Sequence, residues 1–536
     1  MSARIQKEHL YALLGIAILL GIWEITSLIA GGFIVPSPLT TIGCAFSKLT
    51  EGLTWKQISI TLFRVLIGFA IAFISGIVTG IIIGGNRDLE HILRPTIVLF
   101  QGMPPILWAI PLILIFGTGN LSPILVISLI CFPLVTLNIA EGTKTEPLEL
   151  QEMLKIYAPS RKARLRELTI PHLRPFILSS LKIGIVLGIK ASVVAEFFGS
   201  NDGIGFQIEA AYQSFEVKNL FAWGIILILL IIILDWSLSK LGIINRLVTL
   251  EVIKIQNRKC HSASLTLTKK NLYSAIKTIN TSPQQAEKMT IVLRSVSFSY
   301  PPDMLSSTDK NSINPKASPT YSFADLKKQN TREYEFDSIS QTRKVLTNIN
   351  LEVKSNEIAV ITGDSGIGKT TLLKLIAGIY TPDSGEIKAP KNIGFVFQED
   401  RLLPWQTVIK NVALPLLYSE KSSPIPPLCF ASFLLGEVGL QNDAFKFPSQ
   451  LSGGMKKRAA LARCFARLPE VILMDEPFTG LHREARFDLW EKLFTLLKTR
   501  ELPVVIVTHF PEDIPKPEMC TFYELSGKPA SLISMK

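Results

Sequence analysis

Long apolar segments recur along the first half of the chain and are missing from the second half. Six of them approach the roughly 20 residues that a helix needs to cross the hydrocarbon core of a bilayer, and charge, proline or glycine bounds each one. They cover residues 10–30, 60–84, 97–117, 121–140, 176–198 and 221–240. The pattern predicts an all-α membrane domain with six spans within residues 1–247.

The third apolar segment is interrupted by Pro104, Pro105 and Pro111. Proline inside a span frees backbone groups, which then need partners inside a helix bundle or along a wet path. The interruption therefore indicates a translocation route. A kinked helix that serves only packing is the alternative.

Basic residues alternate with the spans in a way that predicts topology. They precede the first span and follow the second, fourth and sixth, whereas the loop 199–220 carries three carboxylates against one lysine. Because positively charged loops stay in the cytoplasm, we expect both termini on the cytoplasmic side of a bacterial inner membrane. The apolar core of the first span is longer than that of a signal peptide, so we expect this span to be retained.

Residues 151–171 are rich in charge although they stand between two spans, and the charge pattern places them in the cytoplasm. Leu150, Met153, Leu154 and Tyr157 fall at i, i+3, i+4 and i+7, which predicts one apolar stripe of a helix. Pro159 should end that helix, and Ser160 can cap a second one. An amphipathic hairpin resting on the lipid headgroups is an open alternative for this segment alone.

Composition supports a protein that lies partly in the membrane. Apolar residues make up 48% of the chain and charged residues 19%, with a formal net charge of +12. The basic residues cluster between apolar segments, so we expect an anionic membrane face and no nucleic acid as their partner. The six cysteines and six histidines form no CxxC or HExxH pattern, so we expect neither a transition-metal site nor a disulfide framework.

The second half alternates strand and helix patterns after a polar linker at 248–287. The buried-strand pattern EIAVIT runs directly into GDSGIGKT, which is GxxxxGK[ST] between a strand and a helix. Such a loop wraps phosphates with backbone N–H groups, while its lysine adds charge and its threonine offers a hydroxyl to Mg²⁺. The pattern predicts an α/β P-loop NTPase domain at 288–536 that binds ATP and Mg²⁺. The predicted ATP-binding residues of the loop are Gly363, Asp364, Ser365, Gly366, Ile367, Gly368, Lys369, Thr370 and Thr371.

Two carboxylates end the apolar strand pattern VILMDEP at 471–477. At the end of such a strand, Asp475 is a candidate Mg²⁺ ligand together with Thr370, and Glu476 a candidate to polarise the attacking water. Carboxylates with a purely structural role are the alternative.

A second candidate anion site lies at LSGGM, where Ser452, Gly453 and Gly454 precede a predicted helix. One nucleotide needs only one cradle. Two cradles in one chain therefore suggest that each serves a different nucleotide, shared with a partner subunit.

GDSGIGKT, LSGGM and VILMDEP, in this order, resemble the ATP-binding subunit of ABC transporters over residues 288–536. The resemblance implies an ATP hydrolase in which Ser452, Gly453 and Gly454 bind the partner's ATP. It further implies that Tyr300 stacks on adenine, that Gln398 contacts the metal and the γ-phosphate, and that His509 senses the γ-phosphate.

Glu152, Ala158 and the LTIP run that ends at Pro171 resemble the EAA loop of importer permeases, over 148–171. In that family the loop docks on the ATPase near the glutamine loop. FQEDRLLPW and AEFFGSNDGIG are similar to the nitrate, sulfonate, taurine and pyrimidine-precursor group of ABC importers. The resemblance implies a permease fused to its ATPase, a homodimer, and an extracytoplasmic solute-binding protein that delivers a small solute. An exporter and a membrane-anchored regulatory ATPase are the alternatives.

Three features depart from the family pattern. His482, in the TGLH run that follows VILMDEP, stands where the family usually has an aspartate. Asn356 stands where a glycine is common, just before Glu357. Residues 301–342 form an insertion rich in Ser, Lys, Asn and Asp, a composition that predicts a disordered, solvated loop.

Overall fold

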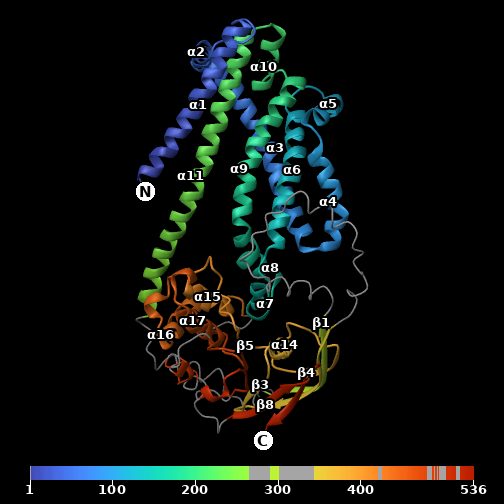
Figure 1. The fold of residues 1–536 in the computed structure, drawn as a ribbon, viewed down its shortest axis with the longest axis vertical. Coiled ribbons are helices and arrows are strands. Elements are labelled where there is room, and N and C mark those ends of the chain that lie inside the picture. Colours follow the sequence, from blue (N-terminus) through green and yellow to red (C-terminus); the bar gives the residue numbers. More distant parts are fainter. Residues whose placement is uncertain are drawn as a thin grey trace, which may run out of the picture. The chain divides into compact units, whose positions relative to one another are not determined.

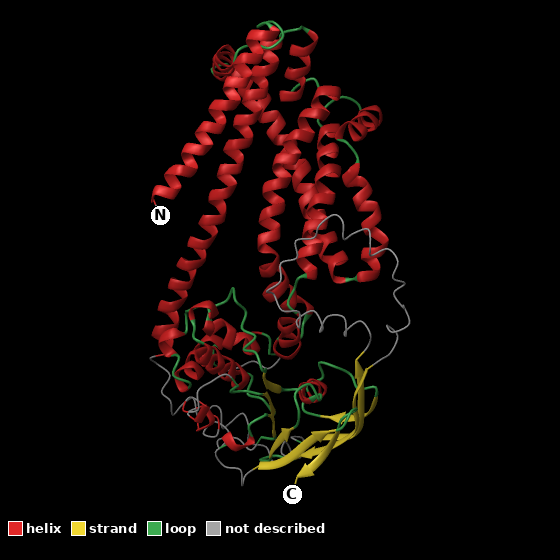
Figure 2. Ribbon diagram, in the orientation of Figure 1, coloured by secondary structure: helices red, strands yellow, loops and turns green. Residues whose placement is uncertain are grey.

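The computed structural model describes residues 2–264, 290–300, 343–419, 425–479, 502–514 and 520–535, with a few more between 484 and 493. The predicted insertion at 301–342 and His482 lie outside the described residues. Contacts divide the chain into two units, Met1–Glu146 with Thr169–Val252 and Pro147–Leu168 with Ile253–Lys536. All described strands belong to the second unit (Figure 2).

The first unit consists of helices, which confirms the predicted all-α membrane domain. Five described helices are long and apolar enough to cross a membrane, and a bent pair adds a sixth if it is counted as one span. The helices of this unit are α1 Ser2–Ala30, α2 Pro38–Leu49, α3 Gly52–Gly85, α4 Arg87–Gly102, α5 Pro105–Phe116, α6 Leu121–Lys144, α9 Ile170–Gly199, α10 Ile204–Gln213 and α11 Val217–Ser264. The last helix thus continues through the first part of the linker predicted at 248–287.

The third predicted span is broken between α4 and α5, which meet at an angle of 91°. Pro104 is the N-cap of α5 and Pro105 occupies its first turn, where the missing N–H costs no helical hydrogen bond. Pro111, by contrast, lies inside α5 without ending it. The break therefore falls at the first two of the three prolines.

The centre of the membrane unit is the packing of α3 against α6 and α9 (Figure 1). Gly68, Gly76, Gly80 and Gly84 recur along the face of α3 that meets α6, which lets the two backbones approach closely. At Gly80 an added Cβ would lie 2.7 Å from Cβ of Ile139 and 2.8 Å from the carbonyl oxygen of Thr136. That position excludes any larger side chain unless the helices move apart.

A buried ion pair joins α3 to the end of α9 that precedes the loop 200–203. Arg64 donates to Oε1 of Glu196 at 3.0 Å and to the carbonyl oxygen of Asp202 at 2.9 Å, and it also pairs with the Asp202 carboxylate. Glu196 in turn accepts from the hydroxyl of Thr61 at 2.9 Å and from the backbone N–H of Gly205 at 3.0 Å. Because each charge has partners, these groups are satisfied within an apolar bundle.

The second unit contains two sheets, which confirms the predicted α/β domain. The larger has the order β5-β6-β7-β3-β8-β9 and is parallel apart from β9, and the smaller is antiparallel with the order β2-β1-β4. Its strands are β1 Ile291–Tyr300, β2 Arg343–Val353, β3 Ile358–Thr362, β4 Ser384–Lys388, β5 Ile393–Val396, β6 Val471–Asp475, β7 Val504–Val507, β8 Cys520–Ser526 and β9 Ser531–Met535. Its longer described helices are α14 Lys369–Ile376, α15 Val408–Leu417, α16 Pro427–Glu437 and α17 Gly453–Ala466.

Residues 148–168, which we name the docking segment, belong to this second unit. The segment contains α7 Leu148–Tyr157, α8 Arg161–Arg164 and most of the π-helical turn Leu165–Thr169. Ser160 caps α8 as predicted, accepting from the N–H of Ala163 at 3.1 Å. The predicted apolar stripe is buried in one cluster with β1, β2 and β3, and it therefore packs on protein rather than on headgroups.

The glycine packing of α3 is testable by substitution. We expect Gly80→Ala to destabilise the membrane unit by about 1–3 kcal/mol, because overpacking forces the helices apart. Thermal unfolding of the purified protein in detergent, followed by tryptophan fluorescence, should show the lower Tm. Gly85→Ala in the same helix is the control, since nothing lies within 4 Å of its added Cβ. An equal Tm for the two variants would contradict this packing.

Candidate functional site

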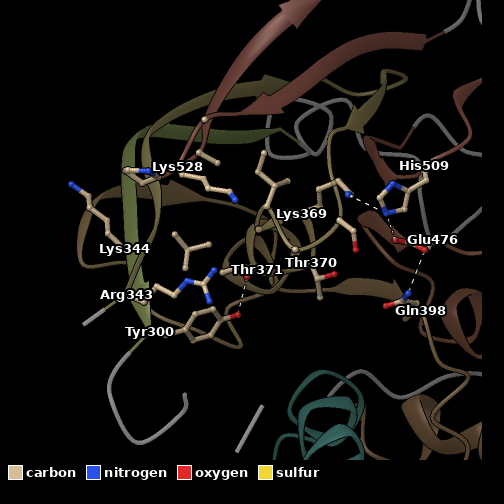
Figure 3. Close-up of a pocket in the computed structure, with 18 residues that line it drawn as sticks. Tyr300, Arg343, Lys344, Lys369, Thr370, Thr371, Gln398, Glu476, His509 and Lys528 are labelled. Carbon is tan, nitrogen blue, oxygen red and sulfur yellow. Dashed lines mark hydrogen bonds and ion pairs between the residues drawn. The ribbon is translucent and has the colours of Figure 1, made fainter. Parts of the chain in front are cut away.

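The loop between β3 and α14 forms one wall of a pocket of about 470 Å³ (Figure 3). Ser365 to Thr371 line it, and they face Tyr300, Gln398, Glu476 and His509. Three further basic residues, Arg343, Lys344 and Lys528, also line the pocket. The fold therefore brings together residues that lie up to 230 positions apart, from Tyr300 to Ala530, and places basic side chains suited to phosphates around them.

Lys369 is held by the loop that it belongs to. Its ammonium donates to the carbonyl oxygens of Gly363 at 2.7 Å and Asp364 at 2.8 Å. Burial lowers the pKa of Lys369, although nearby carboxylates, Glu476 first among them, oppose that shift. Gly363 and Asp364 are not among the residues that line this pocket, but their carbonyl oxygens position the lysine that does.

Asp475 has the environment expected of a metal ligand. It is 2% exposed at the end of β6, and burial raises the pKa of its carboxyl group, while a hydrogen bond from Thr370 opposes the rise. Its Oδ1 atom is buried without a hydrogen-bond partner in the described part of the chain. A buried carboxylate oxygen with no partner beside a threonine hydroxyl fits a hard cation such as Mg²⁺. The described residues contain no cluster of three or more His, Cys, Asp or Glu side chains that suits a transition metal.

Glu476, Gln398 and His509 meet around one carboxylate (Figure 3). The amide of Gln398 donates to Oε2 of Glu476 at 3.3 Å, and Nε2 of His509 lies 3.1 Å from Oε1. The same Nε2 lies 3.3 Å from the Lys369 ammonium. One ring nitrogen cannot serve both neighbours at once, so the protonation of His509 decides whether it accepts from the lysine or donates to the glutamate.

Glu476 also has a strained backbone, with φ at +43°. For a residue with a Cβ this left-handed conformation is uncommon, and strained residues of this kind are found at active sites and switch regions. Asn356 has φ at +65°, which explains why glycine is usual at that position.

Tyr300 lies at the end of β1 on the pocket wall. Its hydroxyl is 2.8 Å from the hydroxyl of Thr371, and its ring packs edge-on against Phe298 and Tyr380. These contacts fix the ring beside the phosphate loop, which is compatible with the predicted stacking on adenine.

Ser452, Gly453 and Gly454 lie elsewhere in the unit, at the start of α17, and are not among the residues that line the phosphate pocket. Ser452 caps α17 by accepting from the N–H of Met455 at 3.3 Å. An added Cβ at Gly453 would meet nothing within 4 Å. The geometry within one chain therefore keeps the two predicted anion cradles apart, as nucleotide sharing between two copies requires.

The docking segment carries a carboxylate that is held by two cations of the ATPase. Oε1 of Glu152 lies 2.8 Å from the Lys374 ammonium, and Oε2 lies 2.8 Å from the Arg401 guanidinium. The hydroxyl of Tyr380 also donates to Oε1 at 3.0 Å. Burial opposes ionisation of Glu152, but Lys374 and Arg401 outweigh it and hold the pKa below the usual value of a glutamate.

Two further anchors fix the docking segment on the ATPase. The hydroxyl of Tyr157 donates to the carbonyl oxygen of Phe395 at 2.6 Å and accepts from its N–H at 3.0 Å. Because β5 is the edge strand of the larger sheet, Tyr157 satisfies backbone groups that otherwise lack a partner. Glu167 accepts from Tyr418 at 2.5 Å and pairs with Gln406, while its carbonyl oxygen accepts from Trp405 at 2.8 Å.

The turn after α7 is built without glycine. Ala158 has φ at −147° and ψ at 68°, a conformation open to residues with a Cβ, and its N–H bonds to the carbonyl oxygen of Leu154 at 2.8 Å. The alanine and the following Pro159 therefore make the bend that glycine makes in the family pattern. Pro171 lies in the first turn of α9, in the membrane unit.

Sequence reasoning missed the partners of the docking segment. Arg463 of α17 is 1% exposed, donates to the carbonyl oxygens of Asp400 at 2.9 Å and Arg401 at 2.7 Å, and lies over the ring of Tyr157. It thus joins the LSGGM helix, the loop after Gln398 and the docking segment. The basic residues of FQEDRLLPW and of the helix after GDSGIGKT were visible in the sequence, but their spacing carries no signal for a common carboxylate partner.

Comparison with known proteins agrees with both units. Residues 346–479 match the family described as ABC transporter, and residues 72–242 match the family described as binding-protein-dependent transport system inner membrane component. An uncharacterized ABC transporter ATP-binding protein of Methanocaldococcus jannaschii is 42% identical over 195 residues, which cover 34% of this chain and 71% of that protein. An aliphatic sulfonates import ATP-binding protein of Paracoccus denitrificans is 39% identical over 169 residues, 31% of this chain and 67% of that protein.

A solved structure of a dimeric ATP-binding cassette, bound to ADP and Pi, covers 46% of this chain and 98% of its own, with 25% identity and a TM-score of 0.35. The sequence matches are the stronger finding, since they span both units and most of the length of the two relatives. The resemblance stated from the motifs is confirmed. The chain belongs to the ABC transporter family, as a multi-pass membrane protein that carries its permease domain and its ATP-hydrolysing domain in one polypeptide.

Proposed function

We propose that the chain is an ATP-driven importer of a small solute across the inner membrane. The observation that carries this proposal is the docking segment, whose apolar stripe and Glu152 are buried in the ATPase unit. A segment of this kind, placed between two spans in sequence, provides a mechanical connection from the nucleotide site to the permease. The match of 72–242 to binding-protein-dependent permeases and the import function named for the sulfonate relatives support the direction of transport.

Two copies of the chain would close over two ATP molecules. Each nucleotide would lie between Gly363–Thr371 of one copy and Ser452–Gly454 of the other, because one chain keeps these cradles apart. Tyr300 would stack on adenine. The matched family and the absence of a large external domain between the described spans support an extracytoplasmic solute-binding protein as a further partner.

The residues around Glu476 have separable tasks in hydrolysis. Lys369 leaves the carbonyls of its own loop and binds the β- and γ-phosphates, which offer it full negative charges. Glu476 accepts a proton from the attacking water and orients it, while Gln398 and His509 hold the carboxylate in position. Mg²⁺, held by Thr370 and Asp475 with Gln398 nearby, would offset phosphate charge.

Gln398 connects hydrolysis to the docking segment. It contacts Glu476 at 3.3 Å, and Arg401, three residues further along the same loop, holds Glu152. Movement of the loop when the γ-phosphate arrives or leaves would pull on α7. The termini and the ATPase unit would lie on the cytoplasmic side, where ATP is available.

The two alternative functions, exporter and regulatory ATPase, predict different roles for the docking segment. An exporter needs no EAA-like segment, and a regulatory ATPase needs no coupling of turnover to solute movement. We therefore test the importer by ATP-dependent uptake into proteoliposomes with the solute-binding protein, using taurine, ethanesulfonate, nitrate and a pyrimidine as probes. Steady ATP turnover with no uptake of any probe would favour the regulator, and outward movement would favour the exporter.

Removal of the Glu476 carboxylate tests the chemistry. Glu476→Gln should slow ATP hydrolysis at least about a hundredfold, because general-base assistance is lost while the geometry is kept. The variant should still bind ATP and accumulate a closed dimer, as seen by gel filtration. Glu399→Gln on the Gln398 loop is the control, since that side chain is exposed and forms no ion pair among the described residues. Unchanged turnover of Glu476→Gln would remove the residue from its role.

Charge reversal at Glu152 tests the connection to the permease. Glu152→Lys places a third cation beside Lys374 and Arg401, so the docking contact should fail. We expect basal ATPase activity within about twofold of wild type and uptake reduced at least about tenfold, as loss of a charged contact implies. Glu149→Lys, three residues earlier on α7, is the control. Normal uptake per ATP in the Glu152 variant would show that the docking assignment is wrong.

Acid should weaken the same contact. The folded pKa of Glu152 is lowered, so its stabilising contribution is complete above the unfolded pKa of about 4.3 and is lost as pH falls through the lower folded value. The difference in Tm between wild type and Glu152→Gln should be largest near neutral pH and should shrink below pH ~4. A difference that stays constant down to pH ~3 would mean that the carboxylate is not paired as described.

A further inference from the structure

We propose that Lys190 lines the translocation pathway and selects a small anion as the transported solute. This inference rests on the proposed transport function. The observations behind it come from the membrane unit alone. Lys190 lies in α9, and its side chain is exposed although the helix is apolar and spans the membrane. No ion pair or hydrogen bond of its ammonium group is found among the residues that the structure describes.

Lys190 lies too far from either end of α9 for its ammonium group to reach the aqueous interface. The residue is nine positions before the end of α9 at Gly199, which is about 13 Å along a helix. A lysine side chain reaches only about 6 Å when it snorkels. It is 20 positions after Ile170 at the other end, about 30 Å away. An ammonium group that faces lipid away from the interface is unfavourable, so the surroundings of Lys190 in the membrane should be polar.

The described residues cover the side of α9 that carries Lys190 only in part. Ser179, Ile183 and Phe198 are exposed on the same stripe, and Leu187 and Val194 are half-buried. The opposite face, with Gly184, Gly188 and Ala195, packs on α3, α6 and α5. A second copy of the chain or a wet path must therefore cover the lysine face.

Nearby carboxylates do not neutralise Lys190. Glu196 lies six positions further along α9 but is fully buried and paired with Arg64 at 3.0 Å. Lys182, two turns earlier, donates to the hydroxyl of Ser239 at 2.9 Å, so it is a polar residue with a structural contact. Lys190 therefore has no ion-pair partner among the described residues and lies about 13 Å from the end of α9 at Gly199.

An anion is the solute class that this charge favours. In a symmetric pair of copies, both Lys190 side chains would face the seam between them, and two ammonium groups alone would repel each other. A small oxyanion accepts hydrogen bonds from both and removes the repulsion. A cation would add to the repulsion, and an uncharged solute would leave it uncompensated.

Cysteine accessibility tests the position and the charge without knowledge of the solute. In a background without the six native cysteines, we introduce Val194→Cys, one turn from Lys190, and measure its labelling by anionic and cationic methanethiosulfonates in membrane vesicles. Both reagents should react. The anionic-to-cationic rate ratio should fall at least about tenfold when Lys190→Met is added, whereas Lys182→Met should leave the ratio unchanged. Leu66→Cys on the exposed face of α3 should stay unlabelled.

Each outcome decides the proposal. No labelling of Val194→Cys in any nucleotide state, while basal ATPase activity shows a folded protein, would place the face in lipid and overturn the pathway assignment. An anionic-to-cationic rate ratio at Val194→Cys that stays the same when Lys190→Met is added would overturn the anion selectivity. Failure of every probe to be transported would count against the importer but would leave the labelling result standing.

Selectivity provides the second measurement. In proteoliposomes that show uptake, Lys190→Met should raise the KM for ethanesulfonate at least about tenfold, and Lys190→Arg should restore most of the affinity. Uptake of ethanesulfonate with unchanged KM in the methionine variant would show that Lys190 does not contact the solute.

Discussion

The structure depends most on one carboxylate, that of Glu152, held between Lys374 and Arg401. All three side chains are only 12–13% exposed, so the charges have lost most of their water and need one another. The two cations come from different parts of the ATPase. Lys374 stands on the helix that follows the phosphate loop, and Arg401 follows Gln398. A single residue of the docking segment therefore contacts both the helix that follows the phosphate loop and the loop that contacts Glu476.

The surrounding contacts make this sensing specific. Tyr157 closes the edge of the larger sheet, and Arg463 holds the loop after Gln398 from the other side while lying over the Tyr157 ring. Because Arg463 belongs to the helix that begins at Ser452, closure of a partner's nucleotide on that helix would be felt by the same loop. Few residues separate the hydrolytic centre, the shared cradle and the docking segment. Their connection is made of hydrogen bonds and ion pairs, whose directional geometry would favour the transmission of small rotations.

Local patterns in the sequence predicted much of this fold for physical reasons. The spans, the phosphate loop, the stripe from Leu150 to Tyr157 and the Ser160 cap are all set by residues close together in the chain. The partners of Glu152, by contrast, come from positions more than 200 residues away, and no local pattern encodes such a pairing. The bend of 91° between α4 and α5 was also beyond reach, since proline predicts a break but not its angle. Lys190 was overlooked because three charged residues, spaced six to eight positions apart, do not interrupt an apolar window of this length.

The fusion of permease and ATPase changes what the Glu152 contact must achieve. In separate subunits, docking contacts also have to hold the two proteins together. Here the covalent connection keeps the docking segment at a high effective concentration near its partners on the ATPase. Association of the two domains therefore needs little of the energy of the docking contacts. A buried carboxylate between two cations adds little net stability when compared with apolar contacts of the same size. Its value lies in register, because the charge fits only one position of α7 against Lys374 and Arg401. Under the proposed coupling, the ion pair would serve the transmission of movement more than the assembly of the protein.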